Sequence, residues 1–458
     1  MKYSRSEVHS NTWKIPSIQF EDQTLTSFSG LILFQSLFAR LGLREKLYAC
    51  FRHLSTRSIF GHHVIVLLLV IHLLLGYRKL RDSRYYQNDP LVQRLLGLRR
   101  LPDVATISRA LASANARCVA KLRRLCRRLC LDRLRSLALP RLTLDFDGSV
   151  QSTHRWAEGT AVGFNRHDKG ARSYYPLFCT IAQVGQVFDL LHRRGNVHDS
   201  RDAQPFILRC IRALRTVLKG VALEARLDAA FFSDATVTAL DREGVEFTIS
   251  VPFERFCELK DLIERRRRWK RFNEQLSYFE ADWKPACWDT RYRFVFVRQR
   301  VKRQAKEPVQ LDFFAPVVFG YDFKVIVTNK TTSVKKVVAF HNGRGAQEAI
   351  FGELKSQSQM DYIPVRTLAG NQIYLWSAVL AHNLNRELQM LSSPPQRHTT
   401  EKRTPIWIFQ ELNTIRRNLI QRAGRLTRPQ GRLTLTISAN ASVKHELLQY
   451  LRSLRRAA

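Results

Sequence analysis

The segment from Leu142 to Asp147 constrains the fold of this chain more than any other. Apolar residues alternate there with threonine and aspartate, and this two-residue period is typical of a β-strand with one apolar and one polar face. Asp145 and Asp147 share the polar face, where two like charges are costly unless a cation is near. Asp147 is the better ligand candidate because it ends the strand and Gly148 follows it. We therefore expect Asp147 to bind the cation and Asp145 to lie next to the ligands without binding the cation itself.

The rest of the chain predicts a mixed α/β protein. Apolar residues recur at three- and four-residue spacing before this strand, which indicates helices. Strands and helices alternate after it, which indicates an α/β layer with a mixed sheet. A later stretch breaks this order, and we interpret it as a β-rich insertion rather than a continuation of the main sheet. The predicted parts are a helical region over 1–136, an α/β core over 137–251 and 317–391, the insertion over 252–316, and a linker with a basic segment over 392–458.

The net charge points to a polyanionic partner. The chain has 75 Lys and Arg against 39 Asp and Glu, a surplus of +36, and each phosphate neutralised by such residues releases condensed counterions. Membrane-surface proteins share this signature. However, the longest apolar run, Val64–Leu75, falls short of the about 20 residues that a bilayer span needs. We therefore expect a buried helix there, no membrane, and nucleic acid as the partner.

The cysteines and the N-terminus indicate a reducing compartment. The eight cysteines are scattered without a CxxC pair, so no zinc-binding spacing is present. The N-terminal residues contain no apolar stretch typical of a secretory signal. We expect eight reduced, mostly buried thiols in a cytoplasmic protein.

The segment Leu101–Arg109 is a candidate DNA-binding element. Pro102 and Asp103 are suited to begin a helix, and Arg109 is suited to contact a phosphate or a base edge, as in a helix-turn-helix. A capped helix in an all-α domain explains the same residues equally well. The next predicted helix carries arginines that suit either a solvated or a DNA-facing surface: Arg123, Arg124, Arg127, Arg128 and Arg133.

Three carboxylates are candidates for metal-dependent phosphoryl transfer. That chemistry needs about three carboxylates from different elements, holding two divalent ions about 4 Å apart, and hard oxygen ligands suit Mg²⁺ or Mn²⁺. Asp147 is the first candidate. Asp228 is the second, because it ends a predicted strand, and the carboxyl ends of strands are where α/β sheets place their sites. Either aspartate in isolation could equally be a turn residue.

A predicted helix that begins near Gly343 supplies the third carboxylate. At 100° per residue from Arg344, Glu348 falls at about 40° and Lys355 at about 20°, whereas Glu353 falls at about 180°. Charged residues along one stripe of a helix are most often simply exposed. Here the order of cation, carboxylate and cation suits a metal ligand flanked by contacts to DNA phosphates, so the geometry favours Glu348 over Glu353.

These residues resemble a known family. Arg344, Glu348 and Lys355, separated by three and six residues, resemble the Tyr-Arg-Glu-Lys signature of a large branch of bacterial insertion-sequence DDE transposases. His341 stands at the position of the tyrosine. The resemblance covers about residues 76–391. Further matching motifs are Asn88-Asp-Pro90, Leu144-Asp-Phe-Asp-Gly-Ser149, Gly163-Phe-Asn-Arg166, Lys169-Gly170, Ser173-Tyr-Tyr-Pro-Leu177, Arg194-Gly-Asn196, Arg226-Leu-Asp228 and Phe231-Phe232.

The resemblance implies a ribonuclease-H-like catalytic core with a β-rich insertion, preceded by an all-helical DNA-binding region. Asp147, Asp228 and Glu348 would be catalytic and hold two Mg²⁺ ions, for which Mn²⁺ can substitute. In related enzymes a tryptophan of the insertion can stack on a flipped base, although any single tryptophan is more often a core residue. The expected DNA contacts are Arg344, Lys355, His341, Arg109, Trp269, Trp283 and Trp288.

The function implied is that of a DNA transposase of a mobile element. Such an enzyme cleaves at the element's ends and joins the freed 3′-OH to target DNA. Its partners would be double-stranded DNA, as terminal inverted repeats and target, and a second copy of the chain in a homodimer. We expect it in the bacterial cytoplasm, associated with the nucleoid. The alternatives are a non-catalytic DNA-binding protein that keeps the fold, and a structure-selective nuclease.

Overall fold

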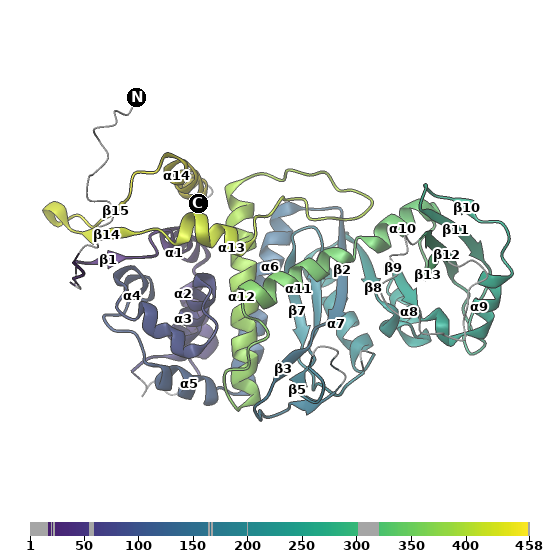
Figure 1. The fold of residues 1–458 in the computed structure, drawn as a ribbon, viewed down its shortest axis with the longest axis horizontal. Helices are drawn as coiled ribbons and strands as arrows, with labels where there is room; N and C mark the ends of the chain where they lie inside the picture. The colour runs from purple at the N-terminus through teal and green to yellow at the C-terminus, as the bar shows by residue number, and fades with distance from the viewer. Residues whose placement is uncertain are drawn as a thin grey trace.

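The computed structural model describes residues 17–19, 21, 23–54, 59–163, 165, 168–198, 200–300 and 320–456. Phe164 and Arg166 of the motifs above, and positions 301–316 of the expected insertion, lie outside these ranges. The molecule is elongated: a helical region, a sheet-centred middle and a second β-rich lobe follow one another along its longest axis (Figure 1).

The helical region is built around one apolar helix. Every residue of α3 from Val64 to Leu75 is buried, because a helix that is apolar on all sides has no face to offer water. The prediction of a buried helix is therefore confirmed. Gly76 ends α3 in the left-handed conformation, at φ 93°, where a glycine avoids the steric cost of a Cβ atom. The helices are α1 (Leu31–Leu41), α2 (Leu43–Phe51), α3 (His62–Leu75), η2 (Leu80–Tyr86), α4 (Pro90–Leu96), α5 (Val104–Ala112) and α6 (Ala116–Leu137).

Within the described ranges, no single helix is long and apolar enough to cross a membrane. Taken together, α3 and η2 have the length and apolar composition of a membrane span, but they are bent by 78° relative to each other. All eight cysteines, each of them described, are free thiols, and six of them are buried. The expectation that most of the thiols are buried is confirmed in the structure.

A long helix joins the helical region to the sheet. Helix α12 (Leu368–Ser392) lies between the two in Figure 1 and is buried along most of its length. Its apolar residues share one core with α3 and with Val187 and Leu190 of the sheet. The helical region therefore packs as part of the same body as the α/β core rather than as a separate module.

The centre of the molecule is a mixed sheet of nine strands in the order β10-β11-β12-β13-β9-β8-β2-β6-β7. Strands β2, β8 and β9 are parallel to one another, and the remaining pairs are antiparallel. The expectation of a mixed α/β fold after a helical region is confirmed. The strands are β2 (Arg141–Gly148), β6 (Leu177–Ile181), β7 (Gln186–Leu191), β8 (Ala222–Leu227), β9 (Glu246–Val251), β10 (Lys270–Arg271), β11 (Leu276–Ala281), β12 (Arg293–Arg300) and β13 (Tyr321–Thr328).

The expected insertion does not form a sheet of its own. Strand β12 pairs with β13 along all eight residues, and β11 and β10 follow it outward. The expectation of strands separate from the main sheet was therefore wrong. The physical reason is that β13, which pairs with β9 on its other side, would otherwise end the sheet with unpaired backbone groups. Helices α8 (Asp234–Arg242), α9 (Cys257–Glu264) and α10 (Val334–Asn342) accompany these strands.

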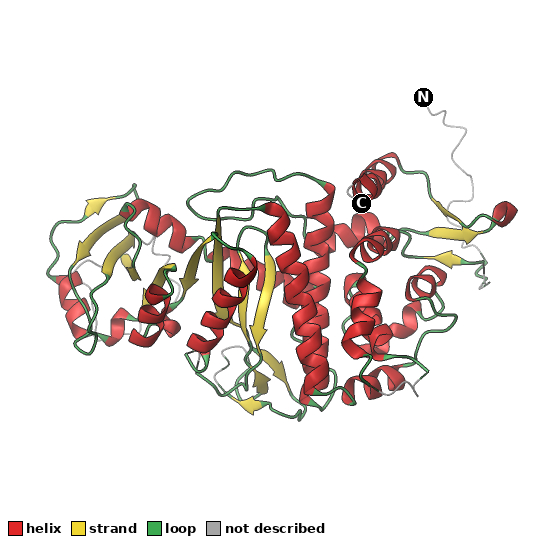
Figure 2. Ribbon diagram, turned by 180° about the vertical axis from the view of Figure 1, so that it is seen from behind, coloured by secondary structure: helices red, strands yellow, loops and turns green. Residues whose placement is uncertain are grey.

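The central strands have one apolar and one ion-paired face. The apolar face packs on α7 (Ala203–Val217), where Phe146 meets Phe206 edge-on with ring centroids 6.1 Å apart. Seen from behind, helices cover the strands on this part of the sheet (Figure 2). On the other face Arg226 and Asp145 are fully buried, and the guanidinium holds the carboxylate through two nitrogens, one at 2.7 Å.

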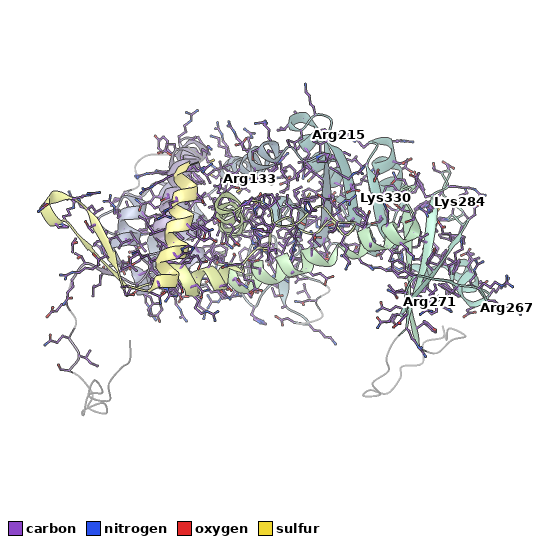
Figure 3. The ribbon with its side chains drawn as sticks, turned by 90° about the horizontal axis from the view of Figure 1, so that it is seen from above. Arg133, Arg215, Arg267, Arg271, Lys284 and Lys330 are labelled. Carbon is purple, nitrogen blue, oxygen red and sulfur yellow. The ribbon has the colours of Figure 1, made fainter. Side chains whose placement is uncertain are left out.

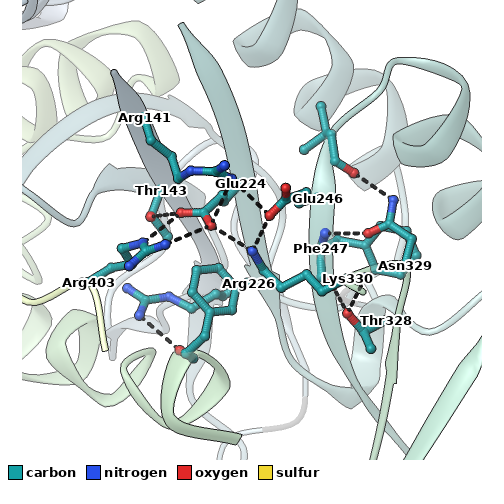
Figure 4. A network of polar contacts seen from close by, with 12 residues as sticks. Arg141, Thr143, Glu224, Arg226, Glu246, Phe247, Thr328, Asn329, Lys330 and Arg403 are labelled. Carbon is teal, nitrogen blue, oxygen red and sulfur yellow. Dashed lines mark hydrogen bonds and ion pairs between the residues drawn. The ribbon is translucent and has the colours of Figure 1, made fainter. Parts of the chain in front are cut away.

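A second buried carboxylate on this face, Glu224, is held by four partners (Figure 4). Its oxygens accept hydrogen bonds from Thr143 at 2.9 Å, Lys330 at 2.6 Å, Arg403 at 2.9 Å and Arg141 at 3.2 Å. Burial acts to raise the pKa of Glu224, but the hydrogen bonds and charges of Arg403 and Lys330 outweigh it and hold this pKa at about 2.

The segment that the sequence predicts as a linker closes this face, and we call residues 396–406 the strap. Its Lys402 carbonyl accepts from Arg226 at 2.7 Å, its Arg403 binds Glu224, and the Ile406 amide donates to the Gln183 carbonyl at 2.9 Å. The strap is therefore an ordered part of the α/β core.

The C-terminal residues return to the helical region. The side chain of Arg416 donates to the carbonyls of Leu73 and Leu74 at the end of α3, so it satisfies acceptors that a helix end leaves open. The elements are α13 (Leu412–Ile415), the π turn η5 (Arg416–Ile420), β14 (Gly424–Thr427), β15 (Thr434–Ile437) and α14 (Ala441–Arg456), and β14 pairs with β1 (Leu25–Thr26).

Replacing Arg226 by methionine is expected to lower the free energy of unfolding by about 3–5 kcal/mol, because it leaves the Asp145 carboxylate buried without its cation. Urea unfolding would measure this loss. The matched control is Arg212→Ala, which removes a pair between an exposed arginine and Glu243 and should cost less than about 1 kcal/mol. Equal losses for the two variants would contradict a special role for the buried pair.

The stability of the protein should fall steeply in acid because of Glu224. Its folded pKa of about 2 lies below the ordinary value of 4.5, so its contribution is complete above about pH 4.5 and is lost as the pH falls toward 2. Glu224→Gln should flatten this part of the curve of unfolding free energy against pH, measured by urea unfolding at several pH values. Glu274→Gln, at an exposed position, should leave the slope unchanged; an unchanged slope in Glu224→Gln would refute the assignment.

Candidate active site

The register of the sheet brings the two predicted aspartates to one place. Strands β2 and β8 are parallel, and Asp145 lies opposite Arg226. Two residues further along each strand, on the same face, come Asp147 and Asp228. Both residues come after the last residue pair between β2 and β8, at the same end of these neighbouring strands. Their side chains therefore lie side by side at this end of the sheet.

Each of these aspartates accepts a hydrogen bond from a backbone amide that follows it closely in the sequence. The Oδ1 atom of Asp147 accepts from the Gly148 amide at 2.8 Å, and its Oδ2 atom lies 3.2 Å from Arg344 Nη1. The Oδ1 atom of Asp228 accepts from the Ala230 amide at 3.0 Å and caps the short helix η3 (Ala229–Phe231). Asp228 therefore has the turn role that the sequence allowed, and it also lies beside Asp147.

Helix α11 (Gly345–Gln357) carries the third carboxylate across the strand ends. Glu348 is exposed, whereas Glu353 is buried on the other side, where it forms an ion pair with Arg386 and accepts from the Leu412 amide. The side chain of Gln347 donates to the Asp145 carbonyl at 3.0 Å. This bond fixes the first turn of α11 against β2, so Glu348 projects near the end of that strand.

One cavity of about 990 Å³ joins these elements. Its wall includes Gly148, which follows Asp147, and Ala229 and Ala230, which follow Asp228. Glu348 and Lys355 line it from α11. The three candidate carboxylates therefore lie in or beside the wall of a single cavity.

Several cations surround this cavity. Burial lowers the pKa of Lys355, while the charges of Asp361 and Asp147 act against that shift. Burial and the nearby charge of Arg344 lower the pKa of Lys324, while Glu348 opposes it. Lys324 was not predicted from the sequence; its signal is a lysine directly before the apolar run Val325–Val327 of β13. These cations lie among the candidate carboxylates, where they can contact the phosphates of an anionic substrate.

The three carboxylates suit a hard divalent cation by ligand type, since Mg²⁺ prefers carboxylate oxygens. In the structure, no group of three or more His, Cys, Asp or Glu side chains lies close enough together to hold a metal ion, within the ranges described. Arg344 supplies the positive charge beside Asp147. Asp145 lies beneath, bound to Arg226, and is buried away from the cavity.

His341 lies inside the protein. It is 1% exposed, and its two ring nitrogens lie 3.0 Å from the Thr248 hydroxyl and 2.9 Å from the Ser250 hydroxyl. Burial, together with nearby cations, lowers the pKa of His341 well below its ordinary value, so the ring is neutral. The expectation that His341 contacts DNA is corrected, because both nitrogens are occupied by strand β9.

The three candidate tryptophans belong to the aromatic core of the β-rich lobe. Trp288 is 4% exposed and packs against Phe232 with centroids 4.8 Å apart. Trp283 meets Phe294 edge-on, and Trp269 is half-buried in the same cluster. Trp288 is therefore enclosed, whereas Trp269 and Trp283 are partly buried.

The basic residues of the helical region divide into two groups. Arg109 is exposed on α5, whose N-terminus is capped by Asp103. Three arginines of α6 bind buried carboxylates instead of facing solvent: Arg123 and Arg127 at Asp189, and Arg133 at Glu387. Arg124 and Arg128 remain exposed. Only part of the predicted basic surface of α6 is therefore available to a partner.

Comparisons with known proteins identify the family. The chain is similar to a piggyBac transposase synaptic complex with hairpin DNA, at 10% identity and a TM-score of 0.44, over 86% of this chain and 79% of that one. It is also similar to a Mos1 transposase paired-end complex with the left transposon end, at 10% identity and a TM-score of 0.18, over 42% and 60%. No curated protein matches it. The family model for the transposase DDE domain, group 1, matches residues 13–458, and the chain therefore belongs to this family of DDE transposases.

Proposed function

We propose that this chain is an active DNA transposase, which cleaves at the ends of its mobile element and joins the freed 3′-OH to target DNA. Asp147, Asp228 and Glu348 are the proposed catalytic residues. The observation that carries the proposal is the meeting of two strand ends and helix α11 at one cavity. These elements are far apart in the sequence, and the fold nevertheless brings Glu348 to the cavity wall together with the residues that follow Asp147 and Asp228.

The proposed catalytic domain is ribonuclease-H-like. The sheet supports this: the antiparallel strands β2, β6 and β7 lie on one side, and β8 and β9 continue parallel to β2 on the other. Helix α11 follows later in the chain and returns to the end of β2. The strands β10–β12 extend the far edge and correspond to the proposed insertion.

The proposed cofactor is a pair of Mg²⁺ ions, for which Mn²⁺ can substitute, held by Asp147, Asp228 and Glu348. When bound, such ions activate the attacking oxygen and stabilise the leaving oxygen. Arg344 and Lys355 flank Glu348 on α11 and would bind phosphates on either side of the scissile bond. Lys324 adds a third positive charge beside them.

The proposed substrate is double-stranded DNA, carrying the element's terminal inverted repeats or the target site. Exposed arginines extend the basic surface beyond the cavity, and on the β-rich lobe Arg267 and Arg271 lie at the end away from the helical region (Figure 3). A homodimer is part of the proposal because two element ends must be held together.

Glu348→Gln is expected to abolish strand cleavage and joining while leaving DNA binding intact, because it removes one proposed metal ligand but keeps the shape of the side chain. A donor DNA with the terminal inverted repeats, incubated with Mg²⁺ and a target plasmid, would be resolved on a gel. Loss of at least about 10²-fold in product is expected for a ligand of this kind.

The matched control is Glu274→Gln, at an exposed position in the turn between β10 and β11. It should retain wild-type activity. Cleavage without joined products by the wild type would instead identify a structure-selective nuclease. Binding alone, without metal-dependent products, would identify a non-catalytic DNA-binding protein.

Metal binding should also be visible without any reaction. Mn²⁺ or Mg²⁺ is expected to raise the melting temperature of the wild type, since a ligand that binds only the folded state stabilises it. The double variant Asp147→Asn, Asp228→Asn should lose this shift. If the variant shows the same shift as the wild type, the ions bind elsewhere and the proposed ligand set is wrong.

A further inference from the structure

The loop between β3 (Gln151–Thr153) and β4 (Ala161–Val162) carries an exposed indole. Trp156 is 59% exposed, and it is the only exposed tryptophan among those that the structure describes. Its neighbours His154 and Arg155 are exposed as well. A single exposed apolar side chain is common at protein surfaces, so the neighbours of Trp156 decide what its ring can bind.

The backbone of this loop is held firmly. The Glu158 amide donates to the Arg366 carbonyl at 2.8 Å, and a Glu158 carboxylate oxygen accepts from the Leu368 amide at 2.9 Å. The Tyr174 hydroxyl donates to the Glu158 carbonyl, and Ala157 is buried. The indole of Trp156 is therefore displayed at the tip of a well-anchored loop.

The loop begins at the wall of the catalytic cavity. Ser149 and Val150 line the cavity together with Glu348, and the side chain of Gln151 donates to the Met360 carbonyl at 2.8 Å, just beyond α11. Trp156 is six residues after Val150, so it lies at most about 20 Å from the cavity wall. That distance corresponds to about six nucleotides of a DNA strand.

Cations and a second ring accompany Trp156 on this side of the cavity. Arg155 is close enough to Tyr362 for its charge to oppose the burial that raises the pKa of that tyrosine. The guanidinium of Arg78 lies over the Tyr362 ring at 5.7 Å, and Arg366 is exposed next to the anchored loop. An exposed aromatic ring beside arginines suits an unpaired nucleotide, because the ring can stack on the base and the guanidinium can contact the phosphate; here that ring is Trp156, and Tyr362 is half-buried.

We propose that Trp156 stacks on an unpaired base of the DNA strand whose phosphodiester lies in the catalytic cavity, while Arg155 binds the adjacent phosphate. This inference rests on the proposed function, because it takes the strand in the cavity to be DNA. It assigns the stacking role to the catalytic domain, since Trp156 is exposed whereas the tryptophans of the β-rich lobe are buried or partly buried.

The test compares two DNA probes in EDTA, so that no cleavage occurs. One is a blunt duplex, and the other is the same duplex with a single-stranded tail of about six adenines, the span estimated above. Fluorescence anisotropy gives the dissociation constant for each. Trp156→Ala should weaken binding of the tailed probe by about tenfold and leave the blunt duplex unchanged, as expected for the loss of one stacked base. Trp156→Phe should retain most of the affinity.

The control is Tyr48→Ala, which removes a ring that is 52% exposed on α2. It should bind both probes as the wild type does. Arg155→Ala should weaken the tailed probe and reduce its salt dependence by about one phosphate contact, with the blunt duplex unchanged. Equal binding of the tailed probe by Trp156→Ala and the wild type would overturn the proposal. A changed oligomeric state of Trp156→Ala would overturn it too, because the indole would then contact a second copy.

The two proposals can fail separately. If Glu348→Gln still joins DNA ends, the proposed catalytic assignment is wrong, while a preference for the tailed probe that depends on Trp156 would still stand. If Glu348→Gln is inactive but Trp156→Ala binds the tailed probe normally, only the stacking role is lost.

Discussion

The ion pair between Arg226 and Asp145 is the contact on which the catalytic region depends. Each partner stands two residues before a proposed catalytic aspartate, on the same face of neighbouring strands. The same guanidinium donates to Phe340, near the end of α10, and to Lys402 in the strap. One buried side chain thus connects two strands, the approach to α11 and the C-terminal part of the chain. A buried pair adds little net stability over apolar packing, so we interpret its main effect as fixing one arrangement of these elements.

Charge balance explains why the ion-paired face of the sheet can be buried at all. Glu224 and Asp145 would each be costly inside the protein without a cation, and lysine and arginine side chains from several elements supply the compensation. Around the cavity, cations and carboxylates are interspersed. There Arg344 pairs with Asp147, and Lys355 lines the same wall as Glu348, so divalent ions held by the carboxylates would leave positive charge for an anionic substrate.

The sequence was sufficient to locate the strand ending at Asp147 and the exposed side of α11, because both follow from a short repeating pattern. It also predicted the buried helix α3. It could not reveal that His341 is enclosed by β9, since spacing along a helix does not say which neighbour covers it. The same limit applies to Arg123 and Arg133, whose carboxylate partners are distant in sequence. The pairing of β12 with β13 likewise depends on which strand edge is free, and that is a property of the assembled sheet.

The strap has a consequence for the order of events during synthesis. Arg403 neutralises Glu224 from 179 positions further along the chain. At about 5–20 residues per second, the ribosome needs about 10–35 s after completing β8 to make this arginine. Until then the ion-paired face of the sheet lacks its cover, and Glu224 has only Thr143, Arg141 and Lys330 as partners. The face that carries the buried carboxylates is therefore closed only after the strap has been made.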